Sequence, residues 1–135
     1  MIFKHTASWV LDRSPHTGEP KTQTRRPAKL GDRVITPSNH PLDHTIFAVE
    51  RAGRLLYEVG RTYAIQPGRG KHGLGCFRLL AIKREQVRGI SEADARAEGF
   101  VCPAAFQEIW TKLYGYASME WLCYALTIEP LLPEK

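Results

Sequence analysis

Residues 121–129 constrain the fold of this chain more than any other stretch, because apolar side chains occupy both of their alternating faces. Successive side chains of a β-strand point to opposite sides of the sheet, so such a strand has to be covered on both sides. We therefore expect a central or barrel-forming strand near the end of the chain. The length of 135 residues suits a single domain, residues 1–135, with one core.

Shorter β-rich runs precede this strand, and glycine- or proline-containing turns separate them. The pattern predicts strands over residues 2–4, 22–26, 33–35, 45–50, 54–59, 62–66 and 75–84. Two prolines and several polar residues in 36–44 predict an inserted surface loop. Residues 130–135 are predicted to be a tail.

Three stretches carry helical signals. Thr6 is a candidate N-cap for a short helix, and Ser91 begins a second helix that Gly99 ends. Pro103 suits the first position of a third helix, which Gly115 ends. Its apolar face is expected to pack on the barrel and consists of Phe106, Ile109, Trp110 and Leu113. Together the patterns predict an α+β fold, a small β-barrel with two to three flanking helices.

The composition is that of an ordinary globular protein, with 43% hydrophobic and 24% charged residues. A net charge of +5 and a pI near 9.3 fit a polyanionic partner such as nucleic acid. No apolar run could span a bilayer and no signal peptide is recognisable, so we expect a cytoplasmic protein without a membrane partner. The three cysteines are too widely spaced for a disulfide framework or a zinc site of the C-x-x-C type.

Residues 18–27 concentrate reactive and cationic side chains between a glycine–proline turn and Pro27. Alternation along a strand puts Thr22, Thr24 and Arg26 on one side, whereas Lys21 lies in the turn and could fold over Thr24. A hydroxyl beside an amine and a guanidinium can perform nucleophilic chemistry or bind an anion. An exposed basic strand end is the alternative.

The loop over residues 68–73 matches the pattern G-x-G-x-x-G, but a strand follows it where a dinucleotide-binding motif needs a helix. It also lacks the first glycine and the hydroxyl residue of a P-loop. What remains is a flexible loop that carries Arg69 and Lys71, two cations suited to phosphate. A hairpin loop kept soluble by charge is the alternative.

Glu98 breaks a local rule, because a carboxylate in the last helical turn faces the negative end of the helix dipole, at a cost of roughly 0.3–1 kcal/mol. Residues that break local rules without an evident gain are candidates for function. Pairing with Arg96 or another surface cation is the alternative.

Aromatic residues offer stacking surfaces for a base, although aromatic residues in strands usually belong to the core. Tyr63, close to the glycine-rich loop, is the best stacking candidate, whereas Trp110 and Trp121 are predicted to be core residues. The histidines His40 and His44 flank Asp43 without further ligands at fitting spacing, so we predict no metal site and no cofactor.

The pattern from Gly18 through Lys21 and Thr24 to Arg26 resembles the signature of the ASCH family, small β-barrel domains similar to the PUA domains of RNA-modifying proteins. Residues 57–71 and 90–100 look like the phage and bacterial branch of that family, and the resemblance extends over residues 2–129. It implies a PUA-like barrel that recognises RNA or a modified nucleoside.

One ASCH branch hydrolyses the amide of N4-acetylcytidine with a lysine, a threonine and a glutamate, and these match Lys21, Thr24 and Glu98 here. The resemblance implies a catalytic set in which Lys21 activates the hydroxyl of Thr24 and Glu98 orients the base or handles the leaving amine. Arg26 would stabilise the oxyanion or hold a phosphate.

Three other functions remain open. The chain could be an RNA-binding module without chemistry, in which Arg26, Arg69 and Lys71 contact phosphates. It could be an accessory protein that binds another protein. A ribonuclease would need an acid–base pair at the RNA 2′-hydroxyl, which Lys21 with Tyr57 or Tyr63 could supply. A monomer is the expected state.

Overall fold

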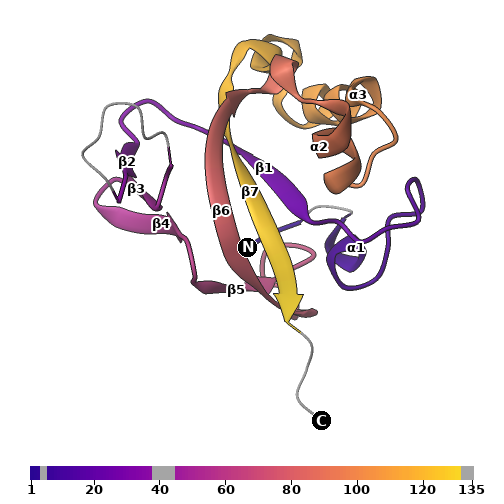
Figure 1. The fold of residues 1–135 in the computed structure, drawn as a ribbon, viewed down its shortest axis with the longest axis horizontal. Helices are drawn as coiled ribbons and strands as arrows, with labels where there is room; N and C mark the ends of the chain where they lie inside the picture. The colour runs from indigo at the N-terminus through magenta and orange to yellow at the C-terminus, as the bar shows by residue number, and fades with distance from the viewer. Residues whose placement is uncertain (4–5, 38–44, 132–135) are drawn as a thin grey trace.

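A computed structural model describes residues 1–3, 6–37 and 45–131 (Figure 1). Most of the predicted loop over residues 36–44 and of the tail over 130–135 lies outside the described residues. The larger sheet contains β1 (Gln23–Pro27), β5 (Thr62–Ile65), β6 (Gly75–Gln86) and β7 (Leu122–Leu131). Its strand order is β1-β7-β6-β5, and all neighbours are antiparallel. The prediction of a central strand near the end of the chain is therefore confirmed.

A second sheet of three antiparallel strands has the order β2-β3-β4 and consists of β2 (Arg33–Ile35), β3 (Ala48–Arg51) and β4 (Arg54–Glu58). An isolated bridge between Ile46 and Ile82 joins it to β6. The α+β prediction is confirmed, but the described strands do not close into a barrel. β1 and β5 are the two edge strands of the larger sheet, and in the described part of the chain they do not pair with each other or with the strands of the second sheet.

The helices lie in one insertion between β6 and β7 and in a short segment at the N-terminus (Figure 1). The insertion holds α2 (Glu92–Ala97) and α3 (Pro103–Tyr114), with the 3-10 turns η1 (Val87–Gly89) and η2 (Tyr116–Glu120) at its two ends. Since β6 and β7 pair from Cys76–Leu131 to Gln86–Leu122, the insertion emerges from one end of a long hairpin. This places α2 and α3 over β1.

The predicted helix signals are largely present. The Ser91 hydroxyl accepts a hydrogen bond from the Asp94 amide at 3.1 Å, Pro103 stands in the first turn of α3, and Gly99 and Gly115 have φ values of 99° and 90°. The predicted short helix is present as α1 (Ala7–Leu11) with Thr6 at its N-cap position, although the Thr6 side chain makes no capping hydrogen bond. The strand predicted over 2–4 is reduced, within the described residues, to a bridge between Ile2 and Gln66.

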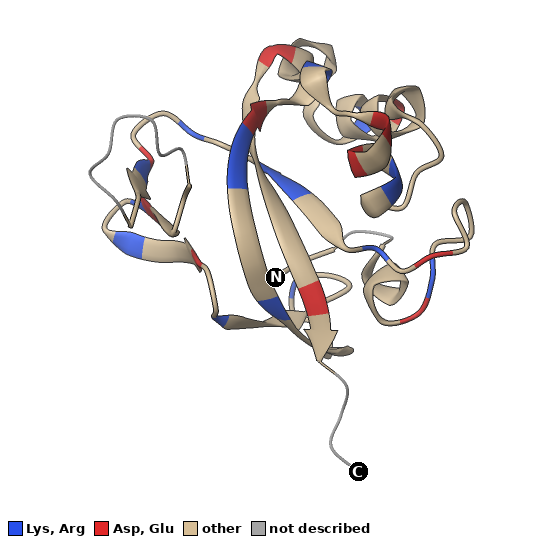
Figure 2. Ribbon diagram, viewed as in Figure 1, with Lys and Arg blue, Asp and Glu red and all other residues tan. Residues whose placement is uncertain are grey.

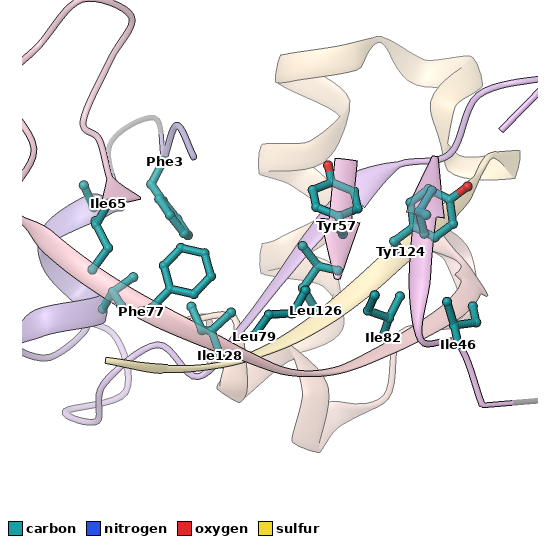
Figure 3. Packing of buried hydrophobic residues seen from close by; sticks show 13 residues of the cluster. Phe3, Ile46, Tyr57, Ile65, Phe77, Leu79, Ile82, Tyr124, Leu126 and Ile128 are labelled. Carbon is teal, nitrogen blue, oxygen red and sulfur yellow. The ribbon is translucent and has the colours of Figure 1, made fainter. Parts of the chain in front are cut away.

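Two apolar clusters stabilise the domain. The larger one lies between the sheets and contains Phe77, Leu79, Tyr124 and Leu126 (Figure 3). The second joins the helical insertion to β7 and contains Phe100, Phe106, Trp110 and Cys123. No helix among the described residues is long and apolar enough to cross a membrane.

The apolar face predicted for α3 is only half buried. Phe106 and Trp110 belong to the core, as expected for Trp110, but Ile109 and Leu113 are 39% and 45% exposed. Trp121, also predicted to be a core residue, is 40% exposed, so that prediction is wrong. It stands just before β7, at the end of the helical insertion, and its ring contacts Tyr114.

Candidate functional site

A buried ion pair joins Lys21 to Glu98, which are 77 positions apart in the chain. Lys21 Nζ lies 2.8 Å from Glu98 Oε2 and donates a second hydrogen bond to the Glu98 carbonyl oxygen at 3.2 Å. Both side chains are almost fully buried, with exposed fractions of 5% and 2%. Glu98 therefore pairs with a buried lysine and not with a surface cation.

Backbone hydrogen bonds bring these two residues together. The Lys21 amide donates to the Trp9 carbonyl at 2.8 Å, and the Thr22 amide donates to the Ala97 carbonyl at 2.8 Å. The chain before β1 is thus attached to α1 on one side and to the end of α2 on the other. Glu98 is the C-cap residue of α2, and the left-handed backbone at Gly99 ends the helix there.

Arg25 enters the same charge network from the other face of β1. Its guanidinium donates to Glu85 at 2.8 Å, to Asp94 at 3.0 Å and to Gln23. Arg25 Nη1 also lies 3.7 Å from Glu98 Oε1. Figure 2 shows the basic part of β1 beside the acidic residues of α2. The fully buried Arg25 side chain therefore fixes α2, and with it Glu98, against the strand.

The sequence reasoning did not single out Arg25. The available signal was that Gln23 and Arg25 alternate with Thr22, Thr24 and Arg26, so both faces of the strand are polar. A strand that is polar on both faces and still buried needs polar partners on both sides.

Several polar atoms at the site have no partner. Glu98 Oε1, the Nε atoms of Arg25 and Arg26, and Trp110 Nε1 are buried and make no hydrogen bond with any described residue. Thr24, which is only 3% exposed, lies at the same site. Buried polar groups are normally satisfied, so such a concentration indicates a place for a ligand.

A cavity of about 270 Å³ opens at these atoms. Its polar lining consists of Thr6, Lys21, Thr24, Arg25, Arg26 and Glu98. The rest of the lining is apolar or aromatic and consists of Ile2, Phe3, Phe100, Phe106, Ile109, Trp110, Leu113 and Tyr114. The half-exposed residues of α3, Ile109 and Leu113, therefore face the cavity. The volume lies near the lower end of the roughly 300–1,000 Å³ typical of small-molecule pockets.

Burial at the cavity makes the charged form of Lys21 less favourable than it is in water. Burial lowers the pKa of Lys21 below its usual value of 10.5, and the neighbouring charges of Arg26 and Arg25 lower it further, against the opposing effect of Glu98. Arg26 lies with its guanidinium carbon 4.9 Å from the centre of the Phe3 ring. Burial also raises the pKa of the neighbouring Cys123 thiol to about 12, which makes that thiol unreactive.

The other predicted binding residues lie elsewhere. The Tyr63 hydroxyl accepts a hydrogen bond from the Glu58 amide at 2.8 Å, and its ring packs on Phe77. Arg69 and Lys71 are exposed on the loop between β5 and β6. None of the three lines the cavity, so the structure brings Lys21, Thr24, Glu98 and Arg26 together but separates Tyr63, Arg69 and Lys71 from them.

No group of three or more His, Cys, Asp or Glu residues that could hold a metal ion occurs in the part of the chain that the structure describes. His40, Asp43 and His44 fall outside it. Comparison of the chain with protein-family models, curated proteins and solved structures finds no match.

Proposed function

We propose that the chain binds a modified nucleoside in the 270 Å³ cavity and hydrolyses the amide of an N4-acylated cytidine. The observation that carries the proposal is the buried Lys21–Glu98 pair, which shares one cavity with Thr24 and whose Glu98 Oε1 atom has no hydrogen-bond partner among the described residues. The resemblance of residues 18–27 to the ASCH signature supports the same assignment of roles. As part of this proposal, the two sheets correspond to the strands of a PUA-like fold.

In the proposed reaction, uncharged Lys21 accepts the proton of Thr24 as the threonine oxygen attacks the acyl carbon. The bond between that carbon and N4 breaks, and the proton passes from Lys21 to the departing amine. Water then attacks the acyl–threonine ester while Lys21 accepts one proton of the water, and Lys21 returns that proton to the Thr24 oxygen as the ester bond breaks. The cytidine amine and the carboxylic acid are the two products.

The remaining groups of the cavity orient the substrate. Glu98 Oε1 has no hydrogen-bond partner among the described residues and would accept a hydrogen bond from the amide N–H of the substrate. Arg26 Nε is a free donor for the oxyanion that forms at the acyl carbon. The aromatic wall formed by Phe106 and Trp110 excludes water and suits the flat base.

RNA binding without chemistry is the second candidate, and the exposure of Arg69 and Lys71 on their loop favours it. It predicts that salt-sensitive RNA affinity falls when either cation is neutralised, whereas replacement of Lys21 has no functional effect. The ribonuclease alternative finds less support, because neither Tyr57 nor Tyr63 lines the cavity with Lys21.

Turnover of N4-acetylcytidine, followed by chromatography, tests the proposal. We expect wild type to release cytidine and the Lys21→Ala and Thr24→Val variants to lose at least about 100-fold in rate. Thr22→Val is the matched control, because Thr22 is an exposed threonine two residues away and should tolerate the change. Equal rates for Thr24→Val and Thr22→Val would exclude Thr24 as the nucleophile.

A further inference from the structure

A second cavity, of about 510 Å³, lies beyond the end of β1. Residues that follow β1 form one wall, and the ends of β6 and β7 form the other. Trp121 offers a ring that is 40% exposed, and the cations Lys29 and Arg84 stand at the same cavity. The chemistry proposed above uses neither the exposed Trp121 ring nor these two cations.

The two cavities are neighbours along β1 and along a row of aromatic rings. Arg26 lines the first cavity, and the next residue, Pro27, lines the second. The Tyr114 ring, at the first cavity, lies 5.9 Å from the Trp121 ring at the second and 4.6 Å from the Trp110 ring. A chain-like ligand could therefore extend from one cavity to the other along these rings.

The second cavity has the chemistry that a single-stranded nucleic acid needs. An exposed aromatic ring stacks on a base of any sequence, and nearby cations bind the backbone phosphates. Asp32 also lines the cavity, but its carboxylate is occupied by Arg51 at 2.8 and 2.9 Å, by the Lys29 amide and by the Tyr124 hydroxyl. Arg51 compensates that negative charge, which leaves Lys29 and Arg84 to attract a phosphate.

We infer that the second cavity binds the nucleotide next to the modified nucleoside, with its base on Trp121 and its phosphate at Lys29 and Arg84. The inference rests on the proposed function of the first cavity and specifies its substrate as a segment of single-stranded RNA, not a free nucleoside. Two adjoining cavities then bind two consecutive nucleotides.

Binding and turnover are measured separately on two probes, free N4-acetylcytidine and a six-nucleotide RNA that contains one N4-acetylcytidine. We expect the RNA to bind wild type at least about 10-fold more tightly than the nucleoside. Trp121→Ala should lose about 10-fold in RNA affinity, because base–aromatic stacking is lost, and should bind the nucleoside as wild type does. Trp121→Phe keeps a ring and should keep the affinity.

Each variant has a matched control. Tyr116→Ala removes an aromatic ring that is 86% exposed and lies at neither cavity, and it should leave RNA affinity unchanged. Arg84→Gln should reduce the slope of log affinity against log salt concentration by about one. Arg78 is an exposed arginine elsewhere on β6, and Arg78→Gln should reduce this slope by less.

The outcomes separate the two proposals. RNA affinities of Trp121→Ala and Arg84→Gln equal to those of their controls would overturn the second subsite, and its apolar rim would then suit a protein segment better. If wild type hydrolyses neither probe, the proposed chemistry fails, while a loss of RNA affinity confined to Trp121→Ala and Arg84→Gln would still support the subsite. Turnover of the free nucleoside as efficient as turnover of the RNA would overturn RNA as the substrate.

Discussion

Two charged networks lie at opposite ends of β1, and they differ in how completely their polar atoms are paired. Beyond the end of the strand, both oxygens of Asp32 are bound by Arg51, and Oδ2 also accepts from the Lys29 amide and the Tyr124 hydroxyl. At its start, Glu98 accepts a side-chain hydrogen bond through Oε2, whereas Oε1 lies 3.7 Å from Arg25 Nη1 and has no hydrogen-bond partner among the described residues. The Asp32 network therefore stabilises the fold, whereas the Glu98 network leaves a buried acceptor available to a ligand.

The largest difference between the two networks is expected in turnover, when Glu98 and Asp32 are each replaced by the corresponding amide. We expect Glu98→Gln to reduce kcat/KM for N4-acetylcytidine at least about 100-fold, because the acceptor for the substrate and the partner of Lys21 are both weakened. Asp32→Asn should change it by less than about threefold. Similar losses in the two variants, measured at a temperature where both are folded, would contradict the separation of roles.

The backbone that follows Glu98 should be nearly as sensitive. A Cβ at Gly99 would lie 2.6 Å from the Trp9 ring and 3.3 Å from the Ser14 side chain, at a φ of 99°. We expect Gly99→Ala to lower the free energy of unfolding by about 3 kcal/mol, through left-handed strain and the clash with a large ring.

Gly115→Ala is the control for this substitution. Its φ of 90° imposes a similar backbone strain, but a Cβ there would meet nothing within 4 Å. We expect a loss of only about 1 kcal/mol in urea unfolding. Equal losses for the two variants would mean that Trp9 moves freely and does not hold the end of α2 in place.

Asp32 should matter for stability rather than for chemistry. Asp32→Asn removes a carboxylate that accepts charge-assisted bonds from Arg51, and we expect a loss of about 2 kcal/mol. Glu50→Gln is the control, because its ion pair with Arg33 spans 3.7 Å at the surface and should contribute less than about 0.5 kcal/mol.

The same network predicts acid sensitivity. The hydrogen bonds from Arg51 hold the pKa of Asp32 well below its usual 3.8, so its contribution is present above pH 3.8 and is lost as the pH falls through the folded-state pKa. Asp32→Asn should therefore lose less stability than wild type on acidification below about pH 4. Parallel acid unfolding curves for the two proteins would contradict this.

The sequence predicted local features well and spatial pairing less well. The caps at Ser91 and Gly99 and the central position of β7 follow from local chemistry and from alternation within one strand. The absence of a closed barrel among the described strands depends on which edges meet, and no short-range pattern encodes that.

At the site, the limits are also physical. Lys21, Thr24 and Glu98 share a cavity because the chain before β1 bonds to α2, a contact between segments far apart in the sequence. Charge, glycine content and the family resemblance associated Arg69 and Lys71 with that site, yet none of these determines which loop approaches which cavity. Trp121 was predicted to be buried from its type, although its place before β7 leaves it half open.

The smallest effect concerns the pH dependence that Lys21 contributes. Burial lowers its folded-state pKa below the 10.5 of the unfolded chain, so the unfolded state binds more protons between these two values. Stability should therefore rise with pH in that window, by less than about 1.4 kcal/mol per pH unit for a single group. Lys21→Met, which cannot titrate, should lack this rise, and the difference between the two proteins isolates it in urea unfolding.

The measurement has to stay below about pH 10, where the unfolded tyrosines begin to ionise. Burial raises the pKa of Tyr57, so ionisation of the unfolded chain lowers stability above that pH and opposes the rise from Lys21. A fall in wild-type stability relative to Lys21→Met between about pH 7 and 10 would mean that Glu98 raises the pKa of Lys21 more than burial lowers it. Lys21 would then remain charged and could not accept the proton of Thr24, so the cavity would bind its ligand without the proposed chemistry.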